Sequence, residues 1–214
     1  MRVKDVSFLR AACVAATLAA PAVAAAAPVS IVAFGDSLSA GYGLAPGEAF
    51  PDQLQAALKA RGYDATVANA GVSGDTTSGG LARLEWSVPA DADAVIVELG
   101  ANDMFQGTAP AVTRKALADI VTKLKAQGQV VLLAGMMAPT NMGPEYAAAF
   151  NRIYPDLAAE QGVLLYPFFL EGVATDRSLN LEDGIHPTAK GIAKIVTAIL
   201  PSVEKLIAQT GKGK

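Results

Sequence analysis

The fold and the candidate site of this chain are both organised around the stretch Phe34-Gly35-Asp36-Ser37-Leu38-Ser39-Ala40-Gly41-Tyr42-Gly43. It follows the short apolar run 29–34, which predicts a buried strand. A Gly-Asp-Ser turn after such a strand presents a hydroxyl at the carboxyl edge of the sheet, where open α/β sheets bind their ligands. Ser37 is therefore a candidate nucleophile, although Ser and Asp are also favoured in turns and at helix N-caps for purely local reasons.

The far end of the chain supplies a candidate base. The segment Asp183-Gly184-Ile185-His186-Pro187 places a carboxylate three residues before the only histidine in the sequence. A serine nucleophile needs a base to take its proton, and the base needs a partner that fixes its tautomer. His186 is the candidate base, and Asp183, which has the shortest link to it, is the candidate partner. The alternative partners are Glu171, Asp176 and Glu182.

The N-terminus has the pattern of an export signal. Three basic residues within positions 2–10 precede the charge-free run 11–27, which closes in alanines. A basic head, a short apolar middle and small residues at the cleavage site are typical of a secretory signal, and the middle is short for a membrane span. We therefore expect residues 1–27 to be removed by cleavage after residue 25, 26 or 27. The remaining chain is expected in the periplasm or outside the cell, without a stable membrane anchor.

Length and composition narrow the range of functions. Residues 28–214 have the length of one domain. Removal of the signal takes away the only cysteine and leaves 14 basic and 19 acidic residues, a net charge of −5. We expect no disulfide or thiol chemistry, no zinc site and no other cofactor, since the mature chain has no cysteine and a single histidine. The basic residues are not clustered, so no nucleic-acid partner is expected, and we expect a monomer.

Apolar strands and amphipathic helices alternate along the mature chain. The predicted strands are 29–34, 65–70, 94–99, 130–134 and 163–166, and the predicted helices are 51–59, a short one near 81–85, one capped by Thr108, one through 150–157, and one from Thr188 to the C-terminal region. This alternation predicts an α/β fold with a five-stranded parallel sheet and helices on both faces. Pro155 predicts a kink in its helix, and Pro201 a kink or a break. Segments 35–47, 71–80 and 136–143 are expected to be loops.

Glycine-bearing loops follow three of the predicted strands and bring polar groups to one edge of the sheet. Acyl transfer needs hydrogen-bond donors aimed at the oxygen that becomes negative in the tetrahedral intermediate. The backbone amides of Ser37 and Gly71 and the side-chain amide of Asn102 would supply three such donors. The sequence therefore predicts an oxyanion hole at the carboxyl edge of the sheet.

Four blocks of the sequence resemble those of the SGNH, or GDSL-type, hydrolase family. They are Gly35-Asp36-Ser37-Leu38-Ser39, Gly71, Gly100-Ala101-Asn102-Asp103 and Asp183-Gly184-Ile185-His186-Pro187, and they span about residues 29–200 in the family order. The resemblance implies a three-layer α/β/α sandwich with a flavodoxin-like sheet. It also implies that Ser37 is the nucleophile, His186 the base and Asp183 its partner, with Ser37, Gly71 and Asn102 in the oxyanion hole.

Within the family, further segments look like the exported bacterial branch of thioesterase I, lysophospholipase and arylesterase enzymes. These segments are Ser39-Ala40-Gly41-Tyr42, Ser73-Gly74-Asp75-Thr76, Gly80-Leu81-Ala82-Arg83-Leu84 and Pro167-Phe168-Phe169. This branch often has a glycine where the chain has Met104, directly after Asn102-Asp103. A bulkier residue beside the oxyanion hole is expected to affect the length of the acyl chain that the site accepts.

Candidate substrate-binding residues lie close to these blocks. Met104, Phe105, Met136, Met137 and Phe168, with Met142 and Phe169, are candidates for an acyl groove, although methionines and aromatic residues after strands equally often belong to the core. Asp75 begins a segment, 75–80, with the composition of a mobile loop, which suggests a lid. Asp36 and Asp103 are interpreted as turn-stabilising residues rather than as acids.

The sequence therefore predicts a serine esterase that hydrolyses small-molecule acyl esters or thioesters through an acyl-enzyme, without metal or cofactor. A carbohydrate O-deacetylase of the same family is an alternative, although Trp86 is the only tryptophan and a sugar platform usually needs more aromatic surface. A non-catalytic exported binding protein is a second alternative. It would have no need of a serine, a base and oxyanion donors together.

Overall fold

The computed structural model describes Met1 and residues 28–212, so the predicted signal 1–27 lies outside the described residues except for Met1. Five strands form one parallel sheet in the order β2-β1-β3-β4-β5. The strands are β1 (Val29–Gly35), β2 (Ala65–Gly71), β3 (Ala94–Glu98), β4 (Val130–Ala134) and β5 (Leu164–Tyr166). The helices are α1 (Ser37–Ala40), α2 (Phe50–Ala60), α3 (Thr77–Ser87), α4 (Ala101–Phe105), α5 (Pro110–Ala126), the 3-10 helix η1 (Thr140–Met142), α6 (Pro144–Asn151), α7 (Ile153–Gln161) and α8 (Ala189–Gln209).

The strand order determines where a ligand can bind. The chain passes from β1 to β2 on one side and then to β3 on the other side of β1, so the strand order reverses between β1 and β3. Ligands of open α/β sheets bind outside the carboxyl ends of the strands at such a switch point. Ser37 follows β1 and Asn102 follows β3, so both lie at this position.

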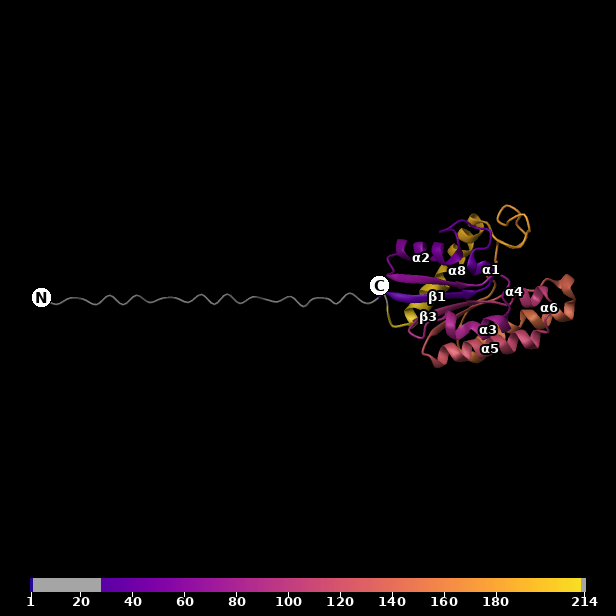
Figure 1. Cartoon of the computed structure of the whole chain (residues 1–214), viewed down its shortest axis with the longest axis horizontal. Coiled ribbons are helices and arrows are strands. Elements are labelled where there is room, and N and C mark those ends of the chain that lie inside the picture. Colours follow the sequence, from indigo (N-terminus) through magenta and orange to yellow (C-terminus); the bar gives the residue numbers. More distant parts are fainter. Residues whose placement is uncertain (2–27, 213–214) are drawn as a thin grey trace.

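Helices cover both faces of the sheet and complete a three-layer α/β/α sandwich, as the sequence predicts. Helices α2 and α8 contact each other on one face, whereas α3 and α5 contact each other on the opposite face (Figure 1). Strands β1 and β3 lie between these layers and are almost entirely buried, because all their side chains except those of Ser30 and Glu98 are apolar on both faces. The sheet is therefore a rigid platform for the residues that follow its strands.

Two short helices replace predicted loop at the carboxyl edge. Helix α1 begins at Ser37, and the Asp36 side chain caps it by accepting a hydrogen bond from the Leu38 amide at 3.0 Å. Helix α4 begins directly after Gly100, whose φ of 119° ends β3 in a turn. Helices of four or five residues are too short to show a hydrophobic period, and this is why the sequence predicted neither.

Prolines explain three further differences from the predicted helices. Helix α5 has Ala109 as N-cap and Pro110 in its first turn, so Thr108 is not the cap. The predicted helix through 150–157 is two helices that meet at Arg152, because Pro155 has no N–H for the Asn151 carbonyl and its ring crowds that carbonyl. A kink or a break was predicted at Pro201, and α8 continues through it without a break, since buried residues on both sides of it hold the helix against the sheet.

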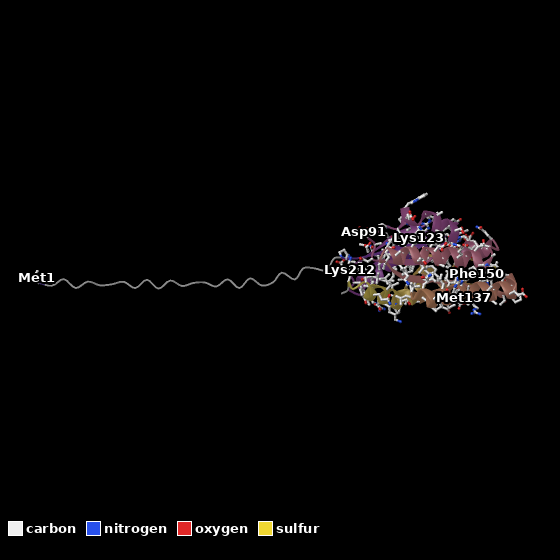
Figure 2. The ribbon with its side chains drawn as sticks, turned by 90° about the horizontal axis from the view of Figure 1, so that it is seen from below. Met1, Asp91, Lys123, Met137, Phe150 and Lys212 are labelled. Carbon is white, nitrogen blue, oxygen red and sulfur yellow. The ribbon has the colours of Figure 1, made fainter. Side chains whose placement is uncertain are left out.

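The two ends of the described domain lie at the amino edge of the sheet. Lys212 forms an ion pair with Asp93 at 2.6 Å, and Asp93 also accepts a hydrogen bond from the amide of Ser30 near the start of β1. Figure 2 shows Lys212 near one end of the domain and Met137 in the other half. Among the described residues, no helix combines the length and apolar character needed to cross a membrane.

Candidate active site

Ser37 is held at the junction of strand β1 and helix α1. Its side chain lies at the edge of the core, with the residue 9% exposed. The Asp36 cap fixes the start of α1, and the first amides of a helix have no acceptor within the helix. The Ser37 amide therefore stands at the first turn of α1, beside the hydroxyl of the same residue.

Ser37, His186 and Asp183 form one hydrogen-bonded series. The Nε2 atom of His186 is 2.9 Å from Ser37 Oγ, and its Nδ1 atom is 2.7 Å from Asp183 Oδ2. An Nδ1 proton donated to Asp183 leaves Nε2 able to accept the serine proton. The structure thus pairs the imidazole with Asp183 rather than with Glu171, Asp176 or Glu182.

Asp183 is kept ionised by local hydrogen bonds. Its Oδ1 atom accepts from the amides of His186 at 3.0 Å and Ile185 at 2.8 Å, while Oδ2 faces the imidazole. These bonds, first those from the His186 and Ile185 amides, lower the pKa of Asp183 to about 2. The carboxylate is therefore negative throughout the pH range in which the imidazole can act as a base.

The loop that carries His186 is closed on itself. The Leu181 amide donates to the His186 carbonyl at 2.7 Å, and the Thr188 amide donates to the Leu179 carbonyl at 2.8 Å. The Tyr42 ring lies with its centroid 4.5 Å from that of the His186 ring. This contact restricts the orientation of the imidazole, and sequence analysis did not single out Tyr42 for it.

Gly71 and Asn102 lie on the two sides of the Ser37 turn. A Cβ atom at Gly71 would overlap the backbone of Ala40, so only glycine lets the end of β2 approach α1 this closely. The Gly71 amide donates to Asn69 Oδ1 at 2.9 Å. Asn102 Nδ2 donates to Asp36 Oδ2 at 3.0 Å and to the Asp75 carbonyl at 2.9 Å. Both groups lie beside the nucleophile, and both already have an acceptor within the protein.

Two buried carboxyl groups lie behind the nucleophile. Burial raises the pKa of Asp36 to about 6, in spite of its hydrogen bonds from Leu38 and Asn102. Burial and the neighbouring Asp36 raise the pKa of Glu98, which accepts from Ser39 Oγ at 2.8 Å, well above its ordinary value. Asp36 therefore supports its turn as the sequence predicts, but it also holds the Asn102 amide.

Asp103 has a different structural role from the predicted one. Its carboxylate accepts from the Thr77 amide at 2.8 Å and from the Thr77 and Thr113 hydroxyls at 2.6 and 3.2 Å. These partners belong to α3 and α5. Asp103 therefore ties α4 to two other helices, whereas the sequence predicted support of its own turn.

A cavity of about 840 Å³ opens beside Ser37, His186 and Asn102. Its volume lies within the range of about 300–1,000 Å³ that is typical of small-molecule sites. The predicted substrate-binding residues that line it are Met104, Phe105, Met136, Met137 and Phe168. Met142 and Phe169 do not line it, because Phe169 packs in the core against Phe50. Leu170, Ala174, Thr175 and Ile185 also line it and were not predicted, since they lie in irregular chain without a periodic pattern.

Asp75 does not line the cavity, contrary to the sequence prediction. Its carboxylate pairs with Arg83 at 2.6 Å, and its side chain is only 12% exposed. The segment 75–80 is not the predicted loop, because Thr76 caps helix α3 and Thr77 is buried. Asp75 instead contributes its carbonyl group to the position of Asn102.

A serine hydroxyl, an imidazole and a carboxylate joined by hydrogen bonds at the carboxyl edge of an α/β sheet define the serine hydrolase class. No group of three or more His, Cys, Asp or Glu side chains within residues 28–212 is placed to hold a metal ion. The chain belongs to the GDSL-like Lipase/Acylhydrolase family, whose profile matches residues 33–194. The family resemblance seen in the sequence is thereby confirmed.

Relatives in this family are similar over most of the chain. Esterase TesA of Pseudomonas aeruginosa is 40% identical over 183 residues, which are 85% of this chain and 91% of that protein. Thioesterase 1/protease 1/lysophospholipase L1 of Escherichia coli K12 is 40% identical over 76% of this chain and 77% of that protein. A crystal structure of TesA, 40% identical, matches with a TM-score of 0.79 and covers 83% of this chain and 99% of its own. The chain is accordingly a carboxylic ester hydrolase.

Proposed function

We propose that the chain hydrolyses esters and thioesters of apolar acyl groups through a covalent intermediate on Ser37. The observation that carries this proposal is the position of the Ser37–His186 pair, 2.9 Å apart, in the wall of the large, mainly apolar cavity. An ester carbonyl beside Ser37 leaves its acyl chain among the methionine and phenylalanine side chains that line this cavity.

The proposed reaction uses each group of the series in turn. Ser37 Oγ attacks the carbonyl carbon while His186 Nε2 takes the hydroxyl proton, and Asp183 stabilises the resulting imidazolium. The imidazolium then protonates the leaving alcohol or thiol. Water, deprotonated by His186, attacks the acyl-enzyme and releases the acid.

The negative oxygen of each tetrahedral intermediate is proposed to accept hydrogen bonds from the Ser37 and Gly71 amides and from Asn102 Nδ2. Gly71 and Asn102 have acceptors of their own in Asn69, Asp36 and Asp75. The oxyanion must therefore share these donors or displace an existing bond. A charged oxygen is a stronger acceptor than the neutral Asn69 and Asp75 carbonyl groups, so exchange with these two favours the transition state over the neutral ester.

We also propose that residues 1–27 are an export signal, that residues 28–214 form one domain, and that the mature enzyme acts as a monomer in the periplasm or outside the cell. The support for the export signal is the basic head, the short apolar middle and the alanine-rich end of the N-terminal segment. N-terminal sequencing of the protein from the exporting host tests this proposal. A mature protein that still begins at Met1 would contradict it.

Hydrolysis of p-nitrophenyl esters from acetate to palmitate tests the proposed substrate class. Burial of one CH₂ group contributes about 0.8 kcal/mol, so kcat/KM should rise by up to roughly fourfold per methylene until the cavity is filled. Ser37→Ala should abolish the activity, whereas Ser202→Ala on α8, a helix that contributes no residue to the cavity wall, should retain it. A preference for acetate alone would indicate a deacetylase. A lack of activity on every ester would support a binding protein.

A further inference from the structure

Arg83 is a largely buried cation that does not line the cavity. It lies on helix α3, its side chain is 14% exposed, and its guanidinium carbon lies 4.3 Å from the centre of the Phe34 ring. A guanidinium carries five N–H donors in a planar fork, so it can hold several acceptors in a fixed relative geometry. A buried arginine that contacts no substrate raises the question of what its donors hold in place.

The donors of Arg83 reach the ends of two strands and the segment before α3, all at the carboxyl edge. Nη2 donates to the Gly35 carbonyl at 2.8 Å, and Nη1 donates to the Ala70 carbonyl at 2.9 Å. Nε donates to Asp75 Oδ2 at 2.6 Å. Gly35 is the last residue of β1 and Ala70 lies near the end of β2, and these two strands pair in the sheet. Asp75 lies in the segment between β2 and α3, outside this backbone ladder.

Each of these acceptors adjoins one of the proposed oxyanion donors. Gly35 lies two residues before Ser37, and Ala70 lies directly before Gly71. Asp75, whose carboxylate Arg83 holds, accepts a hydrogen bond from Asn102 through its carbonyl at 2.9 Å. One side chain thus connects the two strand ends and the segment that carry or hold all three donors.

We propose that Arg83 is a positioning residue that sets the relative placement of the Ser37, Gly71 and Asn102 donors. This role rests on the proposed function, because it concerns the oxyanion hole of that reaction. Hydrogen bonds from a charged donor are short and strong, and an oxyanion hole requires its donors to be placed before the charge develops. A displacement of one loop relative to another weakens donation in the transition state more than it weakens substrate binding.

The test compares kcat and KM of the full chain carrying Arg83→Met, Arg83→Lys or the control Arg61→Met. Arg61 also pairs with a carboxylate, that of Glu204, but on the surface. Arg83→Met should lower kcat by about 10- to 100-fold with KM changed less than about threefold. Arg83→Lys keeps the charge without the planar fork of donors, so its kcat should lie between those of Arg83→Met and the unaltered chain. The kcat and KM of Arg61→Met should match those of the unaltered chain. A kcat for folded Arg83→Met equal to that of the unaltered chain would overturn the proposal.

A double variant separates positioning from a general loss of stability. If Arg83 acts through the oxyanion hole, Arg83→Met should reduce kcat less when Asn102 is already Ala than in the unaltered chain, since only the Ser37 and Gly71 donors then remain to be misplaced and residues that act as one unit are not additive. A full additional loss in the double variant would contradict the proposal.

Asp75→Asn provides a second route if Arg83→Met does not fold. It removes the charged acceptor of Nε and retains the Asp75 carbonyl, and it should also lower kcat with little change in KM. An unchanged kcat in folded Asp75→Asn would count against the positioning role. Inactivity of the unaltered chain on every ester would instead refute the proposed function, so the two failures are distinguishable.

Discussion

The two halves of the site are built on different physical principles. The nucleophile half, named for the role proposed for Ser37, consists of Ser37, Gly71 and Asn102 at the ends of β1, β2 and β3, and it is supported by the buried Asp36 and, as proposed, by Arg83. The base half is a segment of irregular chain between β5 and α8 that carries His186 and Asp183, whose side chains are 19% and 36% exposed. The first half is fixed by packing and buried polar contacts, and the second by hydrogen bonds within one loop.

The two aspartates show this difference most clearly. Burial raises the pKa of Asp36 to about 6, whereas backbone amides lower that of Asp183 to about 2. Ionised Asp36 therefore destabilises the folded state while it orients Asn102, and ionised Asp183 is favoured by the fold. The carboxylate that holds Asn102, a proposed oxyanion donor, therefore lowers the stability of the folded state. The carboxylate that holds His186, the proposed base, raises it.

The largest expected effect is in the base half. His186→Ala should lower kcat by roughly four to six orders of magnitude, because Ser37 loses the base proposed for it. The free energy of unfolding should change by less than about 1 kcal/mol, since the ring lies in a partly exposed loop. Steady-state kinetics and urea denaturation measure the two quantities. Loss of folding in this variant would show that the base half is part of the core. The two halves would then not differ in how they are held in place.

A smaller effect, on both activity and stability, is expected in the nucleophile half. Asp36→Asn can retain the acceptor for Leu38, but it sets an NH₂ group against the Asn102 amide, so kcat should fall by about 10- to 100-fold. In the folded state Asp36 binds its proton more tightly than its ordinary pKa of 3.8 allows. The unaltered chain therefore loses stability through this group as the pH rises from 3.8 to about 6, and the Asn variant does not.

Urea denaturation between pH 4 and pH 7 measures this stability difference. Relative to the unaltered chain, Asp36→Asn should gain about 1–3 kcal/mol across the interval. Asp183 contributes in the opposite direction and at lower pH, because its stabilisation is lost as the pH falls from 3.8 to about 2. A stability difference that does not vary with pH would show that Asp36 carries no ionisation penalty.

The smallest expected effect concerns strain in the base half. Thr175 lines the cavity with a φ of 69°, which is unfavourable for a β-branched residue. Thr175→Gly should relieve about 1–3 kcal/mol of strain and lose about 0.5–1 kcal/mol through greater chain entropy. The Gly variant should therefore be more stable in urea than Thr175→Ala, which also lacks the hydroxyl and retains the left-handed backbone. An Ala variant equal to or more stable than the Gly variant would rule out strain at this position.

The sequence predicted what short-range patterns can encode. The strands are short apolar runs and the longer helices have clear hydrophobic periods, and the order of β1, β2 and β3 brings Ser37, Gly71 and Asn102 to one edge, as expected. Asp183 was the nearest candidate to His186 along the chain, and the structure places it against Nδ1. These predictions depend only on local pattern and on parallel strand topology.

The features that the sequence did not reveal depend on long-range contacts. The composition of 75–80 indicates a loop, but Asp75 is held by Arg83 and Thr77 by Asp103, so the segment is anchored and partly helical. The acceptors of Arg83 include two backbone carbonyl groups, which carry no sequence signal at all. Val112 fits the apolar period of its helix and yet is 49% exposed, because periodicity shows a face and not what covers it.

The position of the chain ends has a practical consequence. Val29 begins β1 and Ser37 follows its other end, so a strand of seven residues, roughly 23 Å long, separates the start of the domain from the nucleophile. Lys212 lies beside Asp93 at the same amino edge. A resin, a carrier protein or a surface anchor joined to either end would leave the mouth of the cavity facing the medium. The enzyme can therefore be immobilised through its termini, with substrate access retained.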